Sequence, residues 1–546
     1  MPMIKAHIFK ITLLCIILAA ILLAVSAISN YTGDTTSSQY KIGQPNPPTL
    51  QTNQLPKNMN HPPGGQFPVP NSAPIVPPNG GMLTRISNDG TKYAPQIIAY
   101  SIIFLIIIGY SLYTRRKIKI DPVNEKLLIL TLLVVGLLLR ISFATLVTGH
   151  PFDIDIFKRW AVAAANNLSQ FYAGHNTSDY PPLYIYVLYI IGKIANIPAM
   201  NPYFTLLLKM PSIMADIATS LLIYKQARKY VSLEASTLLS AFYIFNPAVF
   251  MNSTYWGQVD SFFTLIVISS VILLTEQKIG PASVLFAAAV LMKPQGIIFI
   301  PVFFFELIRL KKFNHFLKAV VCAVSAIAVI ILPFSLDMNV SWIFKLFSNT
   351  AAEYPFAAVN AFNLFSLLGA NYKNDSATLL IFSYYTWGII FIAAVTTFSW
   401  FLLIKGNSRM FVPAIALLQI AGVFTLSTRM HERYLFPAIA LSIISFIYLR
   451  DKRLLLLAAG FSTTTYINTH FVLYETSVGI NAISFGPTLI LTSLLNILLL
   501  FSLAGVLFDV SAKKNYMHFD ADRSVNNQSN SGCRQRMPED AGVGCN

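Results

Sequence analysis

Residues 127–147, LLILTLLVVGLLLRISFATLV, decide the fold class, because they form an apolar run with a single charged residue, Arg140. An α-helix that crosses a bilayer needs about 20 predominantly apolar residues. Comparable runs recur along the 546 residues, of which 55% are hydrophobic and only 11% charged. The sequence therefore predicts an all-α, polytopic helical membrane protein and excludes a soluble fold.

The chain is also basic, with a formal net charge of +16. Its lysines and arginines fall largely in short loops between apolar runs, as the positive-inside bias of membrane proteins predicts. When these loops are placed in the cytoplasm, the chain has about 14 spans and both termini are cytoplasmic. The charge thus reflects topology, and nucleic acid is not an expected partner.

Four segments are predicted from composition. Residues 1–29 form an N-terminal anchor or a signal-like span, cleaved or uncleaved. Residues 30–95 carry 11 prolines between Pro45 and Pro78, a composition that cannot bury a core and predicts an extracytoplasmic linker. Residues 96–510 form the transmembrane domain. The polar residues 511–546 are expected to be a disordered cytoplasmic tail.

A large external loop is predicted at residues 148–203, with Asp153, Asp155 and Trp160 near its start and Asp179 and Tyr180 further on. Apolar residues recur every three or four positions over 154–171, the pattern of an amphipathic helix in the interface plane. Residues 182–197 are predicted to be a second surface helix. A carboxylate at a helix N-terminus often caps the helix, so Asp153 has a structural reading beside a catalytic one.

Further polar clusters fall on the same predicted external face. Four basic or imidazole groups in these clusters break the positive-inside bias, and a bound anion best explains them. They are Lys293, Arg429, His431 and Arg433. For a single lysine the alternative is snorkelling to a lipid headgroup. The clusters comprise Gln258 and Asp260 within 256–260, Lys293 and Gln295 at the turn of a predicted broken hairpin, and Arg429, His431 and Arg433 in a later turn.

These motifs, in this order, resemble the GT-C class of membrane glycosyltransferases. The likeness is closest to prokaryotic mannosyltransferase-like proteins related to the GPI-anchor second mannosyltransferase, and more distant to the dolichyl-phosphate-glucose glucosyltransferases. It extends from about residue 140 to residue 437. The segments that carry it are residues 153–160, 179–183, 209–211 with 216, 256–260, 293–295, 360–363 and 431–437.

The resemblance implies that a hexose, with mannose the first expectation, passes from a polyprenyl-phosphate donor to a lipid-linked or cell-surface acceptor. It also implies a cell-membrane protein of a prokaryote with an extracytoplasmic active site. The acceptor is a glycan or a lipid, membrane lipid surrounds the protein, and no cofactor or metal is expected. A transporter or flippase of lipid-linked glycans is the alternative, although the chain has no second copy of its Asp-x-Asp or His-Glu-Arg motifs, as internal repeats would require.

The same resemblance assigns roles to the candidate residues. Asp153 is the expected base that takes the proton of the acceptor hydroxyl, with inversion at the anomeric carbon. Asp155 is the second choice, as a positioning group or, in a retaining reaction, as the nucleophile. The donor phosphate and sugar are assigned to Lys293, Gln295, Arg429, His431, Arg433, Gln258 and Asp260, and the acceptor loop to Trp160, Asp179 and Tyr180.

Overall fold

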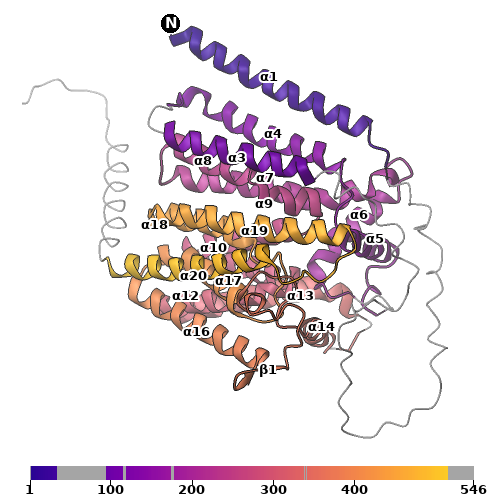
Figure 1. The fold of residues 1–546 in the computed structure, drawn as a ribbon, viewed down its shortest axis with the longest axis vertical. Helices are drawn as coiled ribbons and strands as arrows, with labels where there is room; N and C mark the ends of the chain where they lie inside the picture. Colours follow the sequence, from indigo (N-terminus) through magenta and orange to yellow (C-terminus); the bar gives the residue numbers. More distant parts are fainter. Residues whose placement is uncertain are drawn as a thin grey trace, which may run out of the picture.

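The computed structural model describes residues 2–33, 94–114, 119–173, 178–336, 338–339 and 341–513. Most of the predicted linker and most of the predicted tail lie outside this range. Long helices run side by side through the described part (Figure 1). In its first half the α-helices are α1 (Pro2–Ser29), α3 (Ala94–Thr114), α4 (Glu125–Ala144), α5 (Pro151–Asn166), α6 (Pro182–Ala195), α7 (Phe204–Arg228), α8 (Leu233–Ile244), α9 (Pro247–Phe250) and α10 (Asp260–Thr275).

The second half continues the bundle. Its α-helices are α11 (Ile279–Met292), α12 (Ile300–Leu310), α13 (Phe313–Ser335), α14 (Trp342–Ala352), α15 (Leu364–Leu367), α16 (Tyr384–Gly406), α17 (Val412–Leu426), α18 (Pro437–Leu449), α19 (Arg453–Ser477) and α20 (Pro487–Ala512). The strands β1 (Thr378–Leu379) and β2 (Phe382–Ser383) form one antiparallel hairpin. Short helical turns η3 (Pro122–Asn124), η4 (Asn201–Tyr203), η5 (Met251–Trp256), η6 (Pro294–Phe299) and η7 (Arg409–Phe411) join several of these elements.

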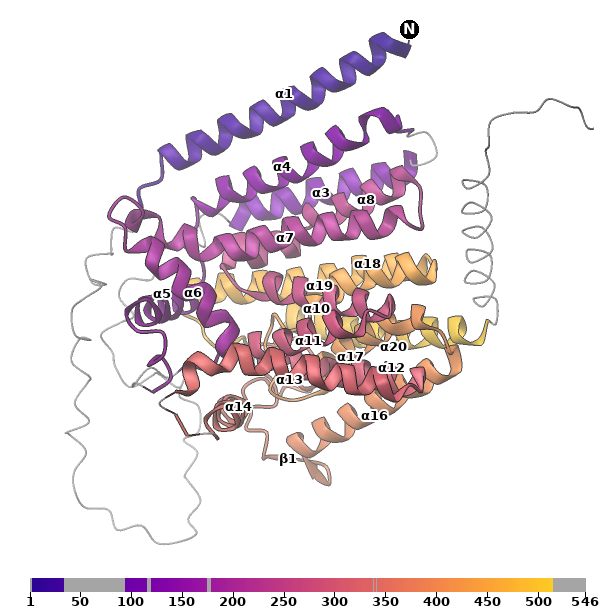
Figure 2. The ribbon, with the colours of Figure 1, turned by 180° about the vertical axis from the view of Figure 1, so that it is seen from behind.

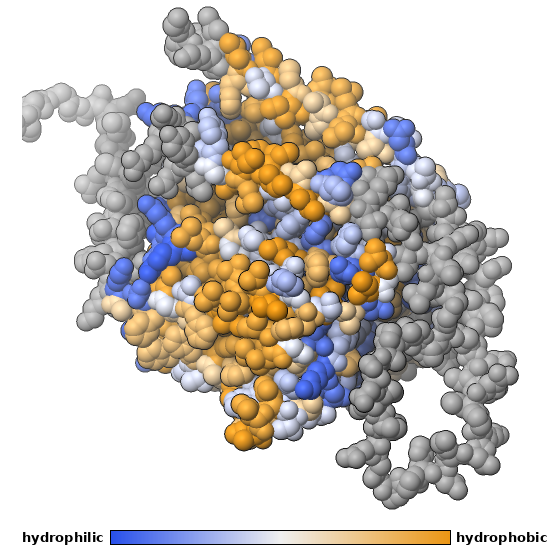
Figure 3. All heavy atoms as spheres, in the orientation of Figure 1, coloured by the Kyte–Doolittle hydropathy of each residue, from blue (hydrophilic) through white to orange (hydrophobic). Residues whose placement is uncertain are grey.

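The predicted class, an all-α polytopic membrane protein, is confirmed. Within the described residues, 7 helices are long and apolar enough to cross a membrane, or 8 if the bent pair 233–244 and 247–256 is one span. Five further apolar helices are shorter, so length supports fewer full spans than the 14 predicted from hydropathy. Hydrophobic side chains cover much of the bundle face, and strongly hydrophilic ones gather toward the helix ends (Figure 3).

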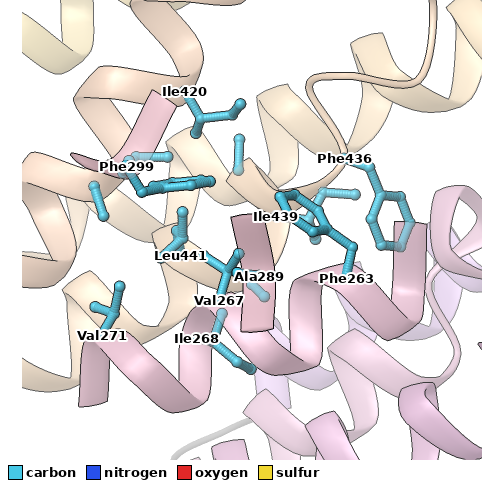
Figure 4. Close-up of a cluster of buried hydrophobic side chains, with 14 of the residues drawn as sticks. Phe263, Val267, Ile268, Val271, Ala289, Phe299, Ile420, Phe436, Ile439 and Leu441 are labelled. Carbon is cyan, nitrogen blue, oxygen red and sulfur yellow. The ribbon is translucent and has the colours of Figure 1, made fainter. Parts of the chain in front are cut away.

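The core lies where the most deeply buried helices meet. Every residue of α17 except its last, Leu426, is buried, and Phe263 of α10 and Leu441 of α18 have no exposed surface. Figure 4 shows side chains of α10, α11, η6, α17 and α18 packed together around Phe299 and Ile439. This packing fixes the ends of α10, η6 and α18, which carry several candidate site residues.

Arg140, the one charged residue in the apolar run 127–147, has a structural role within the bundle. Its Nε donates to Asp216 Oδ2 at 3.1 Å, and neither side chain is exposed. The guanidinium also lies 4.6 Å from the ring centroid of Phe250. A buried cation at membrane depth needs such a partner, because leaving either charge unpaired there would be costly.

The predicted external loop 148–203 folds into two helices at one end of the bundle. In both views α5 and α6 lie at the same end as α14 (Figures 1 and 2). The helix predicted at 154–171 begins earlier and ends earlier, as α5. Its apolar face does not lie on lipid: Phe157, Ala161 and Ala164 are buried in the main core with Ile185 of α6. The apolar face thus packs on protein, and the orientation of this helix in the interface plane stays a prediction.

Two breaks in the bundle bring polar residues to that same end. The predicted interruption at 293–296 is confirmed, since α11 ends at Met292 and η6 follows at Pro294. The second break joins α8 to α9, which continues into a six-residue π-helical turn ending at Trp256. Irregular backbone of this kind is tolerated in membrane proteins where protein or a cavity surrounds it, and it often marks functional sites.

Candidate active site

Asp153 occupies the first turn of α5 without capping it. Pro151 starts the helix, and the cap is His150, whose Nδ1 accepts from the Asp153 backbone N–H at 3.4 Å. Proline is favoured at this first helical position, and the cap residue before it adopts extended backbone, as here. The carboxylate of Asp153 is therefore available for contacts elsewhere, and the capping interpretation does not account for it.

Three groups converge on Asp153 Oδ2. Trp256 Nε1 donates to it at 2.6 Å, His150 Nδ1 lies at 3.2 Å, and Arg433 Nη1 lies at 3.5 Å. Burial alone would raise the pKa of this carboxyl, but His150 when protonated, the charge of Arg433 and the Trp256 hydrogen bond outweigh it and lower the pKa to about 2. Burial also lowers the pKa of His150, so at neutral pH the charge that acts on Asp153 is that of Arg433. Asp153 is thus ionised at neutral pH, and its side chain remains 15% exposed toward the cavity.

Trp256 reaches Asp153 because the backbone on both sides bends sharply. Gly257 ends the π-helical turn with φ +83°, and Gly149 precedes α5 with φ +105°. The His150 N–H donates to the Trp256 carbonyl at 2.9 Å, so the two bends are joined. A Cβ at Gly149 would lie 2.7 Å from that carbonyl oxygen, which excludes larger residues there.

Arg433 and Lys293 place two buried cations beside this carboxylate. Lys293 Nζ lies 2.6 Å from Asp260 Oδ1, and Arg433 contacts Glu432 at 2.6 Å and Asp260 at 3.7 Å. The guanidinium also lies 4.9 Å from the ring centroid of Trp256. Burial lowers the pKa of Arg433 less than the surrounding carboxylates raise it, so the guanidinium stays charged.

A cavity of about 880 Å³ opens over these groups. Ligand sites fall in the range of about 300–1,000 Å³ and combine apolar walls with a few polar groups. Of the predicted residues, those that line it are Asp153, Trp160, Asp179, Tyr180, Lys293, Gln295, Arg429, His431 and Arg433. Its apolar side includes Ile297 and Ile298 of η6 and Ile389 and Ile392 of α16.

Two predicted donor-binding residues, Arg429 and His431, hold the wall in different ways. Arg429 donates from Nε to Asp375 Oδ2 at 2.6 Å and from Nη1 to the Ala351 carbonyl at 2.6 Å, so its charge is already balanced. His431 packs edge-on against Tyr354, and burial together with the charges of Arg433 and Lys293 lowers its pKa to about 3. The imidazole is therefore neutral and can offer a hydrogen bond but no charge.

Gln258 and Asp260 stand behind the cavity rather than in it. Gln258 is 1% exposed, and its Oε1 accepts from the hydroxyl of Tyr180 at 3.5 Å. Asp260 is also 1% exposed, between Lys293 and Asn252, whose Nδ2 donates to Asp260 Oδ2 at 3.1 Å. Both residues orient groups that line the cavity, and neither lines it.

Asp155 is directed away from Asp153. Its carboxylate pairs with Arg159 at 3.0 Å, and Asp155 is absent from the cavity wall although Arg159 lies in it. Residues two apart on a helix do not face each other, and this separates the two acids. Within the described residues, no group of three His, Cys, Asp or Glu side chains could hold a metal ion.

Two acids on the far wall have raised pKa values. Burial raises the pKa of Asp179 to about 6. Burial, reinforced by the charge of Asp179, raises the pKa of Glu353 to about 7. The sequence reasoning selected Asp179 but missed Glu353 and its neighbour Tyr354. The sequence signal for Glu353 was an acid in a long loop between two apolar runs, which is the same signal that identified Asp153.

Comparison with known families bears on this site. Residues 179–428 match the model of glycosyltransferase family 87. The match spans slightly less than half of the chain and includes Asp179, Tyr180, Asp260 and Lys293, while Asp153 and Arg433 lie outside it. It indicates a membrane glycosyltransferase that uses a sugar donor and an acceptor. No curated protein matches the chain significantly.

Proposed function

We propose that the protein transfers a hexose from a polyprenyl-phosphate donor to a glycan or lipid acceptor, with inversion of the anomeric carbon. The observation that carries the proposal is one cavity that holds an ionised carboxylate, Asp153, within 3.5 Å of a guanidinium, Arg433. A carboxylate accepts the proton of an attacking hydroxyl, and a guanidinium stabilises a leaving phosphate. The proposed reaction uses both a group that accepts the proton and a group that stabilises the leaving phosphate.

The apolar side of the cavity supports a lipid-linked donor. Ile297 is 47% exposed and Ile389 is 48% exposed, although both also line the cavity. They belong to η6 and to α16, a helix long and apolar enough to cross a membrane. Isoprenoid chains are fully apolar. A donor whose chain lies between these isoleucines presents its phosphate to Arg433 while the chain itself stays in the hydrocarbon layer of the membrane.

The proposed reaction is a single displacement. The acceptor oxygen forms a bond to the anomeric carbon, the bond from that carbon to the phosphate oxygen breaks, and the hydroxyl proton passes to Asp153. The phosphodiester leaves as a phosphate monoester with one additional negative charge. Because the donors converge on Oδ2 of Asp153, we assign proton acceptance to Oδ1. With Asp155 turned toward Arg159, inversion is favoured over a double displacement.

Arg433 is the residue assigned to the leaving phosphate, with Lys293 second. Arg433 lines the cavity and offers a fork of donors, the geometry that suits phosphate oxygens. Lys293 also lines the cavity and lies 5.6 Å from the ring centroids of both Tyr180 and Tyr434, but its ammonium is already paired with Asp260, which is why it ranks second. Arg429, His431 and Gln295 complete the polar wall around the sugar, with Arg429 fixed by Asp375.

Mannose as the sugar, a prokaryotic cell membrane and an extracytoplasmic site rest on the resemblance to mannosyltransferase-like proteins and on the distribution of basic loops. The direct test is transfer from radiolabelled polyprenyl-phosphate hexoses in membranes that contain the protein, with Asp153→Asn membranes as the control. Product that depends on the protein and on Asp153 is expected, with mannose used best. Absence of transfer from every hexose donor would instead favour transport of a lipid-linked glycan.

A further inference from the structure

A second cavity of about 520 Å³ adjoins the first. Asp179, Thr350 and Glu353 line both cavities, so the two share a wall. The Thr350 hydroxyl donates to the Asp179 carbonyl at 3.0 Å, which ties α14 to the segment that leads into α6. The second cavity is therefore built between two elements that already hold each other, directly beside the proposed reaction centre.

Two aromatic rings form a fixed floor in this second cavity. Tyr172 and Trp342 lie 4.9 Å apart between ring centroids, and both line it. The Tyr172 hydroxyl donates to the Tyr180 carbonyl at 2.6 Å, and Trp342 Nε1 donates to Ser335 Oγ at 3.0 Å. Trp342 is only 6% exposed and supports the partly exposed ring of Tyr172. Because the Tyr172 hydroxyl is bonded elsewhere, its ring presents apolar surface to the cavity, and little side-chain entropy remains to be lost when a ligand packs on it.

Polar groups surround this aromatic floor. Asp179 and Glu353 stand on the shared wall, and within the described residues neither carboxylate forms an ion pair with a cation. Lys345 and Asn349, both exposed side chains of α14, stand on its other side. Asp179 is half-buried and Glu353 is exposed, so both carboxylates can accept hydrogen bonds from the hydroxyl groups of a ligand in this cavity.

We propose that the second cavity binds the body of an oligosaccharide acceptor, one sugar ring packing on Tyr172, which Trp342 supports, while the next sugar extends past Glu353 to Asp153. The proposal rests on the proposed function, because it concerns the acceptor of that reaction. A sugar ring has an apolar face that packs on an aromatic ring and several hydroxyl donors for carboxylates. The acceptor class is thus a glycan of at least two sugars.

Other ligands fit this cavity less well. Asp179 and Glu353 line both cavities, but Lys293, Arg429 and Arg433 line only the first, whereas the exposed Lys345 is the one basic residue among the described residues that line the second. The charged end of the donor therefore belongs with Arg433 in the first cavity. The isoleucine wall that could take a lipid chain is also confined to the first cavity. A neutral, hydroxyl-rich ligand is the class that meets both the carboxylates and the aromatic floor.

The test compares acceptors of different length with the full-length protein in membranes. Octyl glycosides of one, two and three hexoses serve as acceptors, with the donor that the wild-type protein uses. We expect a higher kcat/KM for the two- and three-hexose acceptors than for the one-hexose acceptor. In the double variant Lys345→Ala/Asn349→Ala this preference should fall about tenfold, because two contacts to sugar hydroxyls are lost. Ser348→Ala is the matched control, an exposed α14 residue that lines neither cavity.

The outcomes separate the two proposals. Equal use of all three acceptors by the wild type, or an unchanged preference in the double variant, would overturn the glycan subsite while leaving the transferase function intact. A preference lost equally in Ser348→Ala would also overturn it, since that variant touches α14 without touching the cavity. Failure of the wild type to transfer to any acceptor, including those native to its membranes, would instead refute the proposed function.

Discussion

Asp153→Asn separates a catalytic role of this carboxylate from a structural one. Asparagine keeps the size of the side chain and can still accept from Trp256 Nε1, but it is not a base at neutral pH. If Asp153 takes the proton of the acceptor, transfer should fall at least about 100-fold, the lower end of what general-base catalysis contributes. The measurement is single-turnover transfer in membranes, normalised to the amount of inserted protein.

The expected effect on stability is smaller and has a defined pH dependence. The pKa of Asp153 falls from 3.8 to about 2 on folding, which corresponds to about 2 kcal/mol of stabilisation by the ionised form. Because the folded pKa is the lower one, this stabilisation is present above about pH 4 and is lost as the pH falls toward 2. Asp153→Asn should therefore cost up to about 2 kcal/mol at pH 7 and leave the protein folded.

Asp155→Asn is the matched control for this experiment. It makes the same replacement of a carboxylate by an amide two residues away, breaks a pair with a half-exposed arginine, and leaves the cavity wall intact. Exposed pairs of this kind contribute about 0–1 kcal/mol, so transfer should change by less than about fivefold. Full activity in Asp153→Asn with loss in Asp155→Asn would reverse the assignment, and full activity in both would remove the reaction from this loop.

Three further predictions address the donor, the acceptor and the topology. Arg433→Ala should lower kcat/KM for the donor by about 10- to 100-fold, through loss of a charge-assisted contact of about 1.5–3 kcal/mol; donor kinetics identical to wild type would make Arg433 structural. The pKa of Glu353 is about 7, so between pH 6 and 8 its carboxyl loses its proton and accepts hydrogen bonds more strongly. The kcat/KM for the glycan acceptor should therefore rise over this pH range, and Glu353→Gln should flatten that rise. In a variant without native cysteines, Ser348→Cys should react with an impermeant thiol reagent in intact cells and Lys278→Cys only after permeabilisation, and the opposite pattern would invert the topology.

The helical layout was largely predictable because one physical constraint dominates it. Backbone groups in hydrocarbon must bond within their own helix, so apolar runs of the right length become helices almost regardless of context. The run at 127–147 became α4 (Glu125–Ala144), and the break at Lys293 was predicted from Pro294 and Gly296. The prediction that Asp153 and Arg433 share one face agrees with their contact in the structure, although 280 residues separate them.

The details of the site depended on local geometry that hydropathy does not contain. The start of α5 at Pro151, a residue favoured at the first helical position, decides that Asp153 and Asp155 point in different directions. Recognition of that proline would have separated the two acids from sequence alone. The Trp256 contact, in contrast, depends on a π-helical turn, and the sequence pattern of 251–256 does not distinguish this turn from an ordinary helix end.

The charge cluster offers a reason why a carboxylate with so low a pKa could still act as a base. Arg433 and His150 lower the pKa of Asp153, and Arg433 is also the group nearest to the proposed site of the donor phosphate. When a phosphate engages Arg433, the guanidinium shares its donors with a new anion, and the added negative charge opposes ionisation of Asp153. Both effects raise the pKa of Asp153. On the proposed function, therefore, Asp153 becomes a stronger base only while a donor is bound, and in the empty site the charge of Arg433 and the hydrogen bond from Trp256 hold it ionised.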